Sequence, residues 1–267
     1  MIKFSIVTIT YNAGACLQRT LDSVISQRHP HIEHIIVDGA SKDNTLEMAY
    51  SYEKQSLQKD NGHKVRIVSE PDRGIYDAMN KGLRMATGDY ICFLNAGDFF
   101  PAPNTLDIII EKGGLESTAS PVWPAVIYGR TDIVDNNGRF LHPRRLVPPK
   151  KLSWRSFRYG MLVCHQAFYA RLDIARSIEY DTRYRFSADV DWCIRVMKEA
   201  ERRNLPLTYA DAVVANYTEE GQSTINHRAS LRERYQVMVR HYGKITTALM
   251  HLWFAVRTIF KIKKCNI

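Results

Sequence analysis

Short apolar runs alternate with longer amphipathic stretches along the first part of the chain. The apolar runs predict β-strands, and the stretches between them, whose apolar residues recur with helical periodicity, predict α-helices. The expected strands cover residues 4–10, 32–37, 65–69 and 90–94, and the expected helices cover residues 14–27, 43–57 and 75–85. This alternation predicts an α/β fold with a mostly parallel sheet and helices on both faces.

The pattern changes in the second part of the chain, where the apolar runs are shorter and turn residues separate them. Strands are expected over residues 125–128, 133–134, 139–141, 162–169, 207–209 and 213–217, and a helix over residues 189–202. Residues 135–138 read Asp-Asn-Asn-Gly, a turn signal that joins antiparallel strands, so the sheet is expected to become mixed here. We expect one domain over residues 1–225, with halves 1–110 and 111–225, and a helical appendage over residues 226–267.

The composition fits an ordinary folded domain. Of the 267 residues, 45% are hydrophobic and 24% are charged, which is enough apolar material for a sizeable core. The five cysteines are odd in number and scattered without metal-ligand spacing, which favours reduced thiols in a cytoplasmic protein. An apolar strand begins almost at the first residue, so no export signal is expected. His29, His31 and His34 lie between a helix and a strand and are expected at the surface.

The net charge of +9 is concentrated near the carboxyl end of the chain. Residues 226–267 contain nine Lys or Arg and a single acid, Glu233, whereas the residues before them are nearly neutral. A basic segment attached to a neutral domain predicts attraction to an anionic surface, such as membrane lipid or RNA, rather than a basic substrate cleft. Because the sequence contains no RNA-binding motif, we expect no nucleic-acid partner.

The last expected helix, over residues 245–267, has an apolar face and a basic, polar face. The apolar face comprises Ile245, Leu249, Leu252, Trp253, Val256, Ile259 and Phe260. The opposite face comprises Thr247, His251, Arg257, Thr258, Lys261 and Lys264. Such a helix predicts docking on the surface of an anionic membrane, and its polar interruptions argue against a membrane span. The alternative is a helix that packs on its own domain or on a second copy of the chain.

Polar side chains follow the first two expected strands at the points where they end. Thr8, Thr10, Tyr11 and Asn12 lie at the end of the first strand, and Asp38 follows the second. Because open α/β sheets bind ligands at the carboxyl ends of their strands, these residues are expected to bind a nucleotide. A carboxylate at Asp38 can accept a ring N–H of uracil or of guanine, which leaves the base open. The glycine-rich signatures of dinucleotide-binding and P-loop proteins are absent from the sequence.

Two longer motifs carry a resemblance to a known family. Residues 69–82 read Ser-Glu-Pro-Asp-Arg-Gly-Ile-Tyr-Asp-Ala-Met-Asn-Lys-Gly, and residues 86–98 read Ala-Thr-Gly-Asp-Tyr-Ile-Cys-Phe-Leu-Asn-Ala-Gly-Asp. With these motifs the chain resembles family 2 glycosyltransferases of the GT-A fold, close to the bacterial transferases that build capsule, O-antigen and colanic-acid-type polysaccharides. The match is dense over residues 1–110, and weaker markers continue to Ser223.

The resemblance implies an inverting transfer of a sugar from a nucleoside-diphosphate sugar, with uridine or guanosine as the nucleoside, to a hydroxyl of a glycan or lipid-linked acceptor. Such a reaction needs a general base and a group that stabilises the departing diphosphate. The family holds Mn²⁺ or Mg²⁺ with a D-x-D element, but this chain has Asn95 and Gly97 where the acids usually stand. Asp98 is therefore the expected metal ligand, with a helix cap as the alternative role, and Asn95 is expected to contact the donor.

The same resemblance implies roles for four further residues. Arg73 and Lys81 are expected to face the diphosphate or the donor sugar, although lysines on helix surfaces often meet only water. His165 and Gln166, on an expected strand, are expected to line the pocket for the donor sugar or the acceptor. For His165 the alternative is a hydrogen-bonded core residue.

The segment Ser-Ala-Asp-Val-Asp-Trp over residues 187–192 matches the element of the family that supplies the base. Asp189 is the expected general base, and Asp191 is expected to support it or to contact the acceptor. Judged without the resemblance, two acids in the first turn of a helix would be partners of the helix dipole.

Two other functions remain open from the sequence. The altered D-x-D element would also suit a non-catalytic module that binds nucleotide sugars. A sugar nucleotidyltransferase would need a glycine-rich, basic signature after the first strand, and residues 10–14 read Thr-Tyr-Asn-Ala-Gly instead. Residues 219–223 are expected to close over the donor, with His227 adding a contact to the metal or phosphate.

Overall fold

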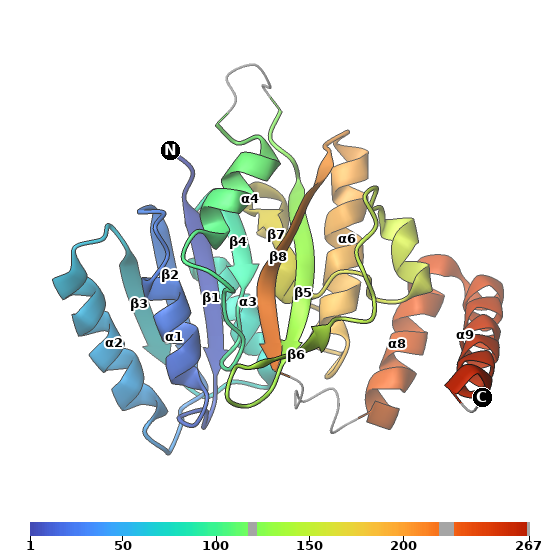
Figure 1. Cartoon of the computed structure of the whole chain (residues 1–267), viewed down its shortest axis with the longest axis horizontal. Helices are drawn as coiled ribbons and strands as arrows, with labels where there is room; N and C mark the ends of the chain where they lie inside the picture. Colours follow the sequence, from blue (N-terminus) through green and yellow to red (C-terminus); the bar gives the residue numbers. More distant parts are fainter. Residues whose placement is uncertain (117–121, 219–226, 266–267) are drawn as a thin grey trace.

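A central β-sheet runs through the part of the chain that the structure describes (Figure 1). The computed structural model describes residues 1–116, 122–218 and 227–265, with side chains in the last range from 228 to 256. The first elements are β1 (Phe4–Thr10), α1 (Leu17–Ile25), β2 (Ile32–Asp38), α2 (Thr45–Lys59), β3 (Lys64–Ser69), α3 (Ile75–Met85) and β4 (Tyr90–Phe93). The strands pair in the order β3-β2-β1-β4, all parallel, which confirms the predicted parallel sheet.

The second part of the chain extends this sheet with antiparallel pairs. Its elements are α4 (Thr105–Gly113), β5 (Val126–Val134), β6 (Phe140–Pro143), η1 (Trp154–Tyr159), η2 (His165–Ala167), β7 (Phe168–Arg171), α5 (Leu172–Ala175), α6 (Ala188–Arg202), β8 (Leu207–Thr218), α8 (His227–Tyr242) and α9 (Lys244–Cys265). Strand β7 lies antiparallel between β4 and β5, and β5 also pairs with antiparallel β6 and with parallel β8. The predicted change to a mixed sheet is therefore confirmed.

Strands β5 and β8 are each longer than the apolar pattern indicates. The expected strands at 125–128 and 133–134 are one strand, because the polar residues between them still pair with β8. Likewise, 207–209 and 213–217 form one strand, whose register against β5 shifts near Asp211, a residue with a left-handed backbone (φ +47°). Backbone pairing continues through such a bulge although the side-chain alternation is broken.

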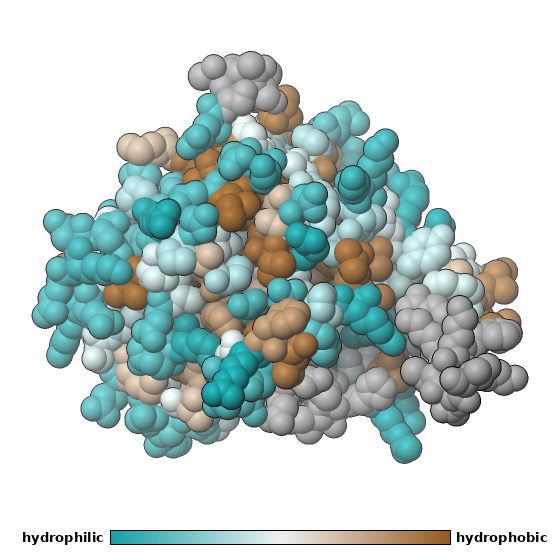
Figure 2. Space-filling view, viewed as in Figure 1, coloured by the Kyte–Doolittle hydropathy of each residue, from teal (hydrophilic) through white to brown (hydrophobic). Residues whose placement is uncertain are grey.

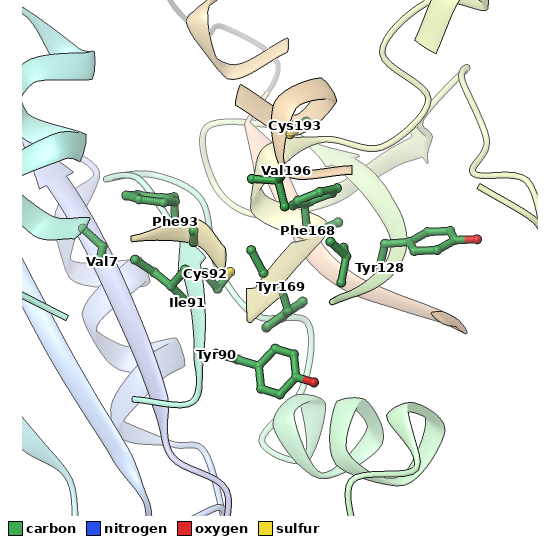
Figure 3. Packing of buried hydrophobic residues seen from close by; sticks show 14 of the residues in the cluster. Val7, Tyr90, Ile91, Cys92, Phe93, Tyr128, Phe168, Tyr169, Cys193 and Val196 are labelled. Carbon is green, nitrogen blue, oxygen red and sulfur yellow. The ribbon is translucent and has the colours of Figure 1, made fainter. Parts of the chain in front are cut away.

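Aromatic packing fixes the start of α6 against the centre of the sheet. Trp192 is fully buried, and its ring stacks on that of Tyr180 with the centroids 4.9 Å apart. The rings of Phe93 on β4 and Phe168 on β7 meet the indole at 5.7 and 5.8 Å. Figure 3 shows Phe93 and Phe168 in the core that β4 and β7 form with α6. The first turn of α6 is thereby held over the carboxyl end of β4.

The prediction that the histidines near β2 lie at the surface was wrong for two of them. His34 is fully buried, with Nδ1 2.7 Å from the Tyr52 hydroxyl, and burial lowers its pKa to about 3. His29 is buried too, with Nε2 2.7 Å from the carbonyl oxygen of Ile2. Strand β2 lies between β1 and β3 and is covered on both faces, so every one of its side chains is enclosed whatever its polarity.

The chain ends in a hairpin of two helices, α8 and α9, at one side of the sheet (Figure 1). The two helices join at Gly243, whose φ of +82° is the left-handed conformation that ends many helices. Within the described ranges, none of the helices combines the length and the apolar character that crossing a membrane requires.

Candidate active site

The predicted nucleotide-binding residues gather at the edge of the sheet where the parallel strands end. The strand pairing places Thr10 beside Asp38, and Asp38 beside Ser69. Tyr11, Asn12 and Arg73 are exposed on the loops that follow these strands. One edge of the sheet therefore carries hydroxyl, aromatic, carboxylate and guanidinium groups, which is the arrangement expected for a ligand site in an open α/β sheet.

Asp38 is fully buried and holds two of these loops together. Its Oδ2 accepts hydrogen bonds from the Ser41 backbone N–H at 3.0 Å and from the Ser69 hydroxyl at 2.6 Å, and its Oδ1 accepts one from the Ser41 hydroxyl. These contacts fix the ends of β2 and β3 in relation to each other. A contact between Asp38 and a nucleotide base stays a prediction.

The two threonines of β1 differ in what they contact. Thr8 is fully buried. Its hydroxyl donates to the carbonyl oxygen of Leu94 at 2.8 Å and lies 2.9 Å from His34 Nε2, so both of these contacts are inside the protein. This placement gives no support to the predicted substrate contact of Thr8. The Thr10 hydroxyl is also buried but has no hydrogen-bond partner within the described part of the chain.

Asn12 joins the loops after β1 and β2. Its side-chain oxygen accepts a hydrogen bond from the Lys42 backbone N–H at 2.8 Å, and its own N–H donates to the Ser41 hydroxyl at 2.8 Å. The backbone of Asn12 is left-handed (φ +47°), a conformation that asparagine tolerates better than most residues. The amide therefore shapes the loop that carries the exposed ring of Tyr11.

Asp98 lies in a tight turn after β4 that other elements hold in place. Gly97 has φ +99°, its N–H donates to the Thr20 hydroxyl on α1 at 2.9 Å, and its carbonyl accepts from the Thr218 hydroxyl on β8 at 2.9 Å. The Asp98 carboxylate is buried and accepts a hydrogen bond from Gln166 Nε2 at 2.7 Å. Burial, only partly offset by this hydrogen bond, raises the pKa of Asp98 to about 6.

This turn offers oxygen ligands that fit a divalent cation. Asn95 begins the turn, and its side-chain oxygen Oδ1 is buried without a hydrogen-bond partner among the described residues. An unpartnered amide oxygen and a carboxylate that burial destabilises are the donors that Mg²⁺ and Mn²⁺ prefer. In the described ranges, three or more His, Cys, Asp or Glu side chains do not come together in a group that could hold a metal ion. Asp98 and Asn95 would thus need phosphate and water to complete the coordination.

His165 connects this turn to Asp189 at the start of α6. Its Nε2 lies 3.2 Å from Asn95 Nδ2, and its Nδ1 lies 3.5 Å from Asp189 Oδ2. The Tyr76 hydroxyl of α3 donates to Asp189 Oδ1 at 3.1 Å. Burial raises the pKa of Asp189, but the hydrogen bond and charge of His165 outweigh it, so the pKa lies below its ordinary value. Asp189 is therefore an ionised carboxylate that keeps 16% of its side-chain surface exposed.

The segment with His165 and Gln166 is a 3₁₀ turn, whereas the apolar pattern predicted a strand over 162–169. Strand β7 begins only at Phe168. The turn directs the two neighbouring side chains to different acids, with His165 near Asp189 and Gln166 on Asp98. An extended strand would place neighbouring side chains on opposite faces of the sheet, so the turn is what brings both residues to one site.

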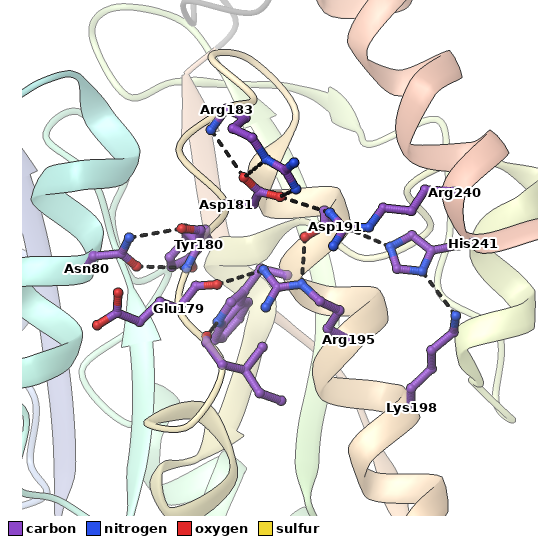
Figure 4. Close-up of polar contacts among 12 residues, drawn as sticks. Asn80, Glu179, Tyr180, Asp181, Arg183, Asp191, Arg195, Lys198, Arg240 and His241 are labelled. Carbon is purple, nitrogen blue, oxygen red and sulfur yellow. Dashed lines mark hydrogen bonds and ion pairs between the residues drawn. The ribbon is translucent and has the colours of Figure 1, made fainter.

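Asp191 faces away from Asp189 although only one residue separates them. Its carboxylate is fully buried, with Oδ2 2.6 Å from Arg195 Nε and Oδ1 2.8 Å from His241 Nε2 on α8 (Figure 4). Burial raises the pKa of Asp191, but His241 and Arg195 outweigh it and hold the pKa below its ordinary value. Helical residues two positions apart point in nearly opposite directions. The expected acceptor contact of Asp191 is therefore not supported, and its contacts assign it to the joint between α6 and α8.

Replacing Asp191 is accordingly expected to lower stability. Asp191→Asn removes a buried charge from Arg195 and His241, so the free energy of unfolding should fall by about 3 kcal/mol. Chemical denaturation followed by circular dichroism measures this change. The matched variant Asp173→Asn, at an acid whose ion pairs are half exposed, should shift it far less, and equal losses would contradict the assignment.

The two basic side chains that are expected to bind phosphate differ in how many contacts hold them. Lys81 Nζ lies 3.0 Å from a carboxylate oxygen of Glu70 and donates to the Pro71 carbonyl at 2.8 Å. Arg73 is exposed on the loop before α3, and its backbone N–H donates to Asp77 at 3.0 Å. Lys81 thus braces the loop that carries Arg73. A contact of either residue with the diphosphate stays a prediction.

Two residues of the recognised motif have contacts that the sequence did not predict. Asn80 donates to the carbonyl of Tyr180 at 3.0 Å and accepts from its N–H at 2.7 Å, which ties α3 to the segment before α6 (Figure 4). Tyr76, on the same helix, reaches Asp189. The sequence feature that could have pointed to these two residues is the motif at residues 69–82, which contains both. Residues 219–223 and the side chain of His227 lie outside the described residues.

Relatives of known family share most of the length of the chain. A sequence model of the family described as "Glycosyl transferase family 2" matches residues 5–176. The chain is 31% identical over 253 residues to a PGL/p-HBAD biosynthesis glycosyltransferase of Mycobacterium bovis, covering 94% of this chain and 90% of the relative. It is 32% identical over 203 residues to the amylovoran biosynthesis glycosyltransferase AmsB of Erwinia amylovora, covering 74% of this chain and 64% of that relative.

Solved structures share the fold. The structure of S. aureus TarS 1-349 in complex with UDP-GlcNAc superposes with a TM-score of 0.66 at 20% identity, covering 89% of this chain and 64% of that TarS fragment. The mannosyltransferase PcManGT from Pyrobaculum calidifontis, in complex with GDP-Man and Mn²⁺, superposes with a TM-score of 0.60 at 17% identity, covering 94% of this chain and 68% of PcManGT. At these identities the likeness shows the architecture, which is the GT-A fold.

Proposed function

Because the chain belongs to glycosyl transferase family 2, we propose that this glycosyltransferase moves a sugar from a nucleoside-diphosphate sugar to an acceptor hydroxyl with inversion at the anomeric carbon. The observation that carries the proposal is the link from the turn after β4 to the start of α6, through Asn95, His165 and Asp189. It brings a carboxylate suited to proton transfer next to the turn suited to the diphosphate.

In this proposal Asp189 is the general base. The acceptor hydroxyl gives its proton to the carboxylate while its oxygen bonds to the anomeric carbon, and the bond between that carbon and the diphosphate oxygen breaks. The lowered pKa keeps Asp189 ionised at neutral pH, and the contacts with Tyr76 and His165 fix its orientation. The nucleoside diphosphate leaves from the opposite side of the sugar, which is why the configuration inverts.

The groups for the leaving diphosphate are proposed to lie around the turn after β4. Asp98 and Asn95 would hold a divalent cation, and the cation supplies positive charge that stabilises the departing phosphates. Gln166 fixes the Asp98 carboxylate, and Arg73, beside the same strand ends, is proposed to contact the diphosphate. PcManGT, which shares the fold, was solved with GDP-Man and Mn²⁺, which supports a cation in this role.

The donor half is proposed to be residues 1–110 and the acceptor half residues 111–225. Uridine and guanosine both stay candidates for the donor, since the structural relatives were solved with UDP-GlcNAc and with GDP-Man. The curated relatives are named for PGL/p-HBAD and amylovoran biosynthesis. We therefore propose a glycan or lipid-linked acceptor of a surface polysaccharide or glycolipid, glycosylated on the cytoplasmic side of the membrane.

Calorimetry with UDP and GDP, each with and without Mn²⁺, tests the donor site. We expect one diphosphate to bind in a metal-dependent way, and its sugar nucleotide to be slowly hydrolysed with release of the same diphosphate. Binding of neither, or equal binding of both without metal, would contradict the proposed donor site. The competing diphosphate is the matched control for non-specific attraction to the basic chain.

A further inference from the structure

The terminal hairpin buries polar residues of α9 and exposes apolar ones. Thr247 is fully buried, and the ring of His251 lies 5.1 Å from that of Tyr235 on α8. Burial lowers the pKa of His251, so a neutral imidazole faces α8. Thr247 and His251, two residues of the polar face of the helical wheel, are therefore turned toward the protein.

The opposite face of α9 is apolar and exposed. Ile245, Leu249, Leu252, Trp253 and Val256 recur at helical spacing, and each exposes between 40% and 80% of its surface. We call these five residues of α9 the hairpin patch. In Figure 2, hydrophobic residues reach the surface at this side of the molecule, beside atoms drawn in grey. A terminal helix that only packed on its own domain would turn this face inward.

The two helices of the hairpin carry exposed basic side chains. Arg228, Arg232 and Lys244 are exposed on the same two helices. The acid of this segment, Glu233, is engaged elsewhere, since its carboxylate accepts the backbone N–H groups of Arg185, Phe186 and Ser187 at 2.9, 2.6 and 3.1 Å.

Electrostatics decides between a lipid surface and a second copy of the chain. Residues 226–267 carry nine Lys or Arg against one acid, so two copies meeting through this patch would bring like charges together. An anionic bilayer accepts apolar side chains at its headgroup boundary and attracts basic side chains.

We propose that the α8–α9 hairpin docks on an anionic lipid bilayer, with the hairpin patch inserted at the headgroup boundary and α9 parallel to the membrane plane. The inference stands on the surface alone and does not depend on the proposed function. Its test involves neither donor nor acceptor, so the two can fail separately.

Co-sedimentation of the full chain with vesicles tests the proposal. The probes are vesicles of phosphatidylcholine alone and of phosphatidylcholine mixed with phosphatidylglycerol. We expect binding to the mixed vesicles that weakens at high salt and falls at least about tenfold in the triple variant Ile245→Ser, Leu249→Ser, Leu252→Ser. All three side chains are exposed, so circular dichroism should show an unchanged fold.

A matched control replaces three equally exposed apolar residues elsewhere, Leu57→Ser, Phe140→Ser and Val147→Ser, and should bind like the wild type. Equal binding by the wild type and the hairpin variant, or an equal loss in the control, would overturn the proposal. So would sedimentation velocity that showed a dimer lost in the hairpin variant together with no vesicle binding. Binding to single-stranded nucleic acid in preference to vesicles would also overturn it.

Discussion

Asp189→Asn is expected to abolish sugar transfer while leaving nucleotide binding nearly unchanged. The amide keeps the size of the side chain and can still meet Tyr76 and His165, but it cannot accept the acceptor proton. Loss of a positioned general base should slow transfer by about 100- to 10,000-fold. Steady-state transfer assays measure the rate, and calorimetry with the preferred diphosphate measures the binding.

The neighbouring acid provides the control for this variant. Asp191 lies in the same helical turn as Asp189, but its carboxylate contacts Arg195 of its own helix and His241 of α8 rather than the site. Substitutions away from the reacting groups have small effects, so the transfer rate of Asp191→Asn per folded molecule should stay within a few fold of the wild type. If Asp189→Asn retained full turnover, Asp189 could not be the base. If both variants lost activity equally, the loss would report disturbance of α6 rather than proton transfer.

Metal-dependent binding of the donor is expected to weaken as the pH falls through about 6 and to be lost in Asp98→Ala. Burial raises the pKa of Asp98, so the carboxyl is protonated and neutral below that pH and ionised above it. A neutral carboxyl does not hold a divalent cation, and each pH unit below the pKa should cost up to about tenfold in affinity. Calorimetry from pH 5 to 7.5 in the presence of Mn²⁺ measures this change. The range extends roughly one pH unit or more on either side of the pKa of Asp98.

The choice of ligand and control separates Asp98 from other titrating groups. A nucleoside-diphosphate sugar serves better than the free diphosphate, because its phosphates are diesterified and do not titrate in this range. Asp98→Asn removes the titration while keeping a partner for Gln166, so its weak binding should be flat with pH. A wild-type metal response in that variant would place the metal ligands elsewhere.

The parallel half of the fold could be predicted from the sequence because three of its four strands, β1, β2 and β4, are buried along their whole length. Strands β1 and β2 are continuously buried, so their apolar runs mark them almost to the residue. The second half gave a weaker signal, since β5 carries Arg130 and Asp132 in a strand whose backbone pairing continues across them. The ends of β5 are set by backbone hydrogen bonds to the neighbouring strands, and these bonds do not require a particular pattern of polar and apolar side chains.

The candidate site could be predicted as a set of residues but not as a set of contacts. The motifs led to Asp98, His165 and Asp189, and the structure brings them to one end of the sheet. They did not indicate that His165 would link Asn95 to Asp189, because that contact depends on a 3₁₀ turn within an apolar run. Nor did they indicate that Asp191 would contact α8 instead of the acceptor, because its partner His241 lies 50 residues away in the sequence.

The first turn of α6 carries the candidate base and also contacts the terminal hairpin. Asp191 and the backbone of residues 185–187 are held by His241 and Glu233 of α8, and Asp189 lies in the same turn. The contacts of α8 and the candidate base thus share one helical turn, so the part of the chain that we propose to dock on lipid is anchored within a few residues of the proposed site of proton transfer.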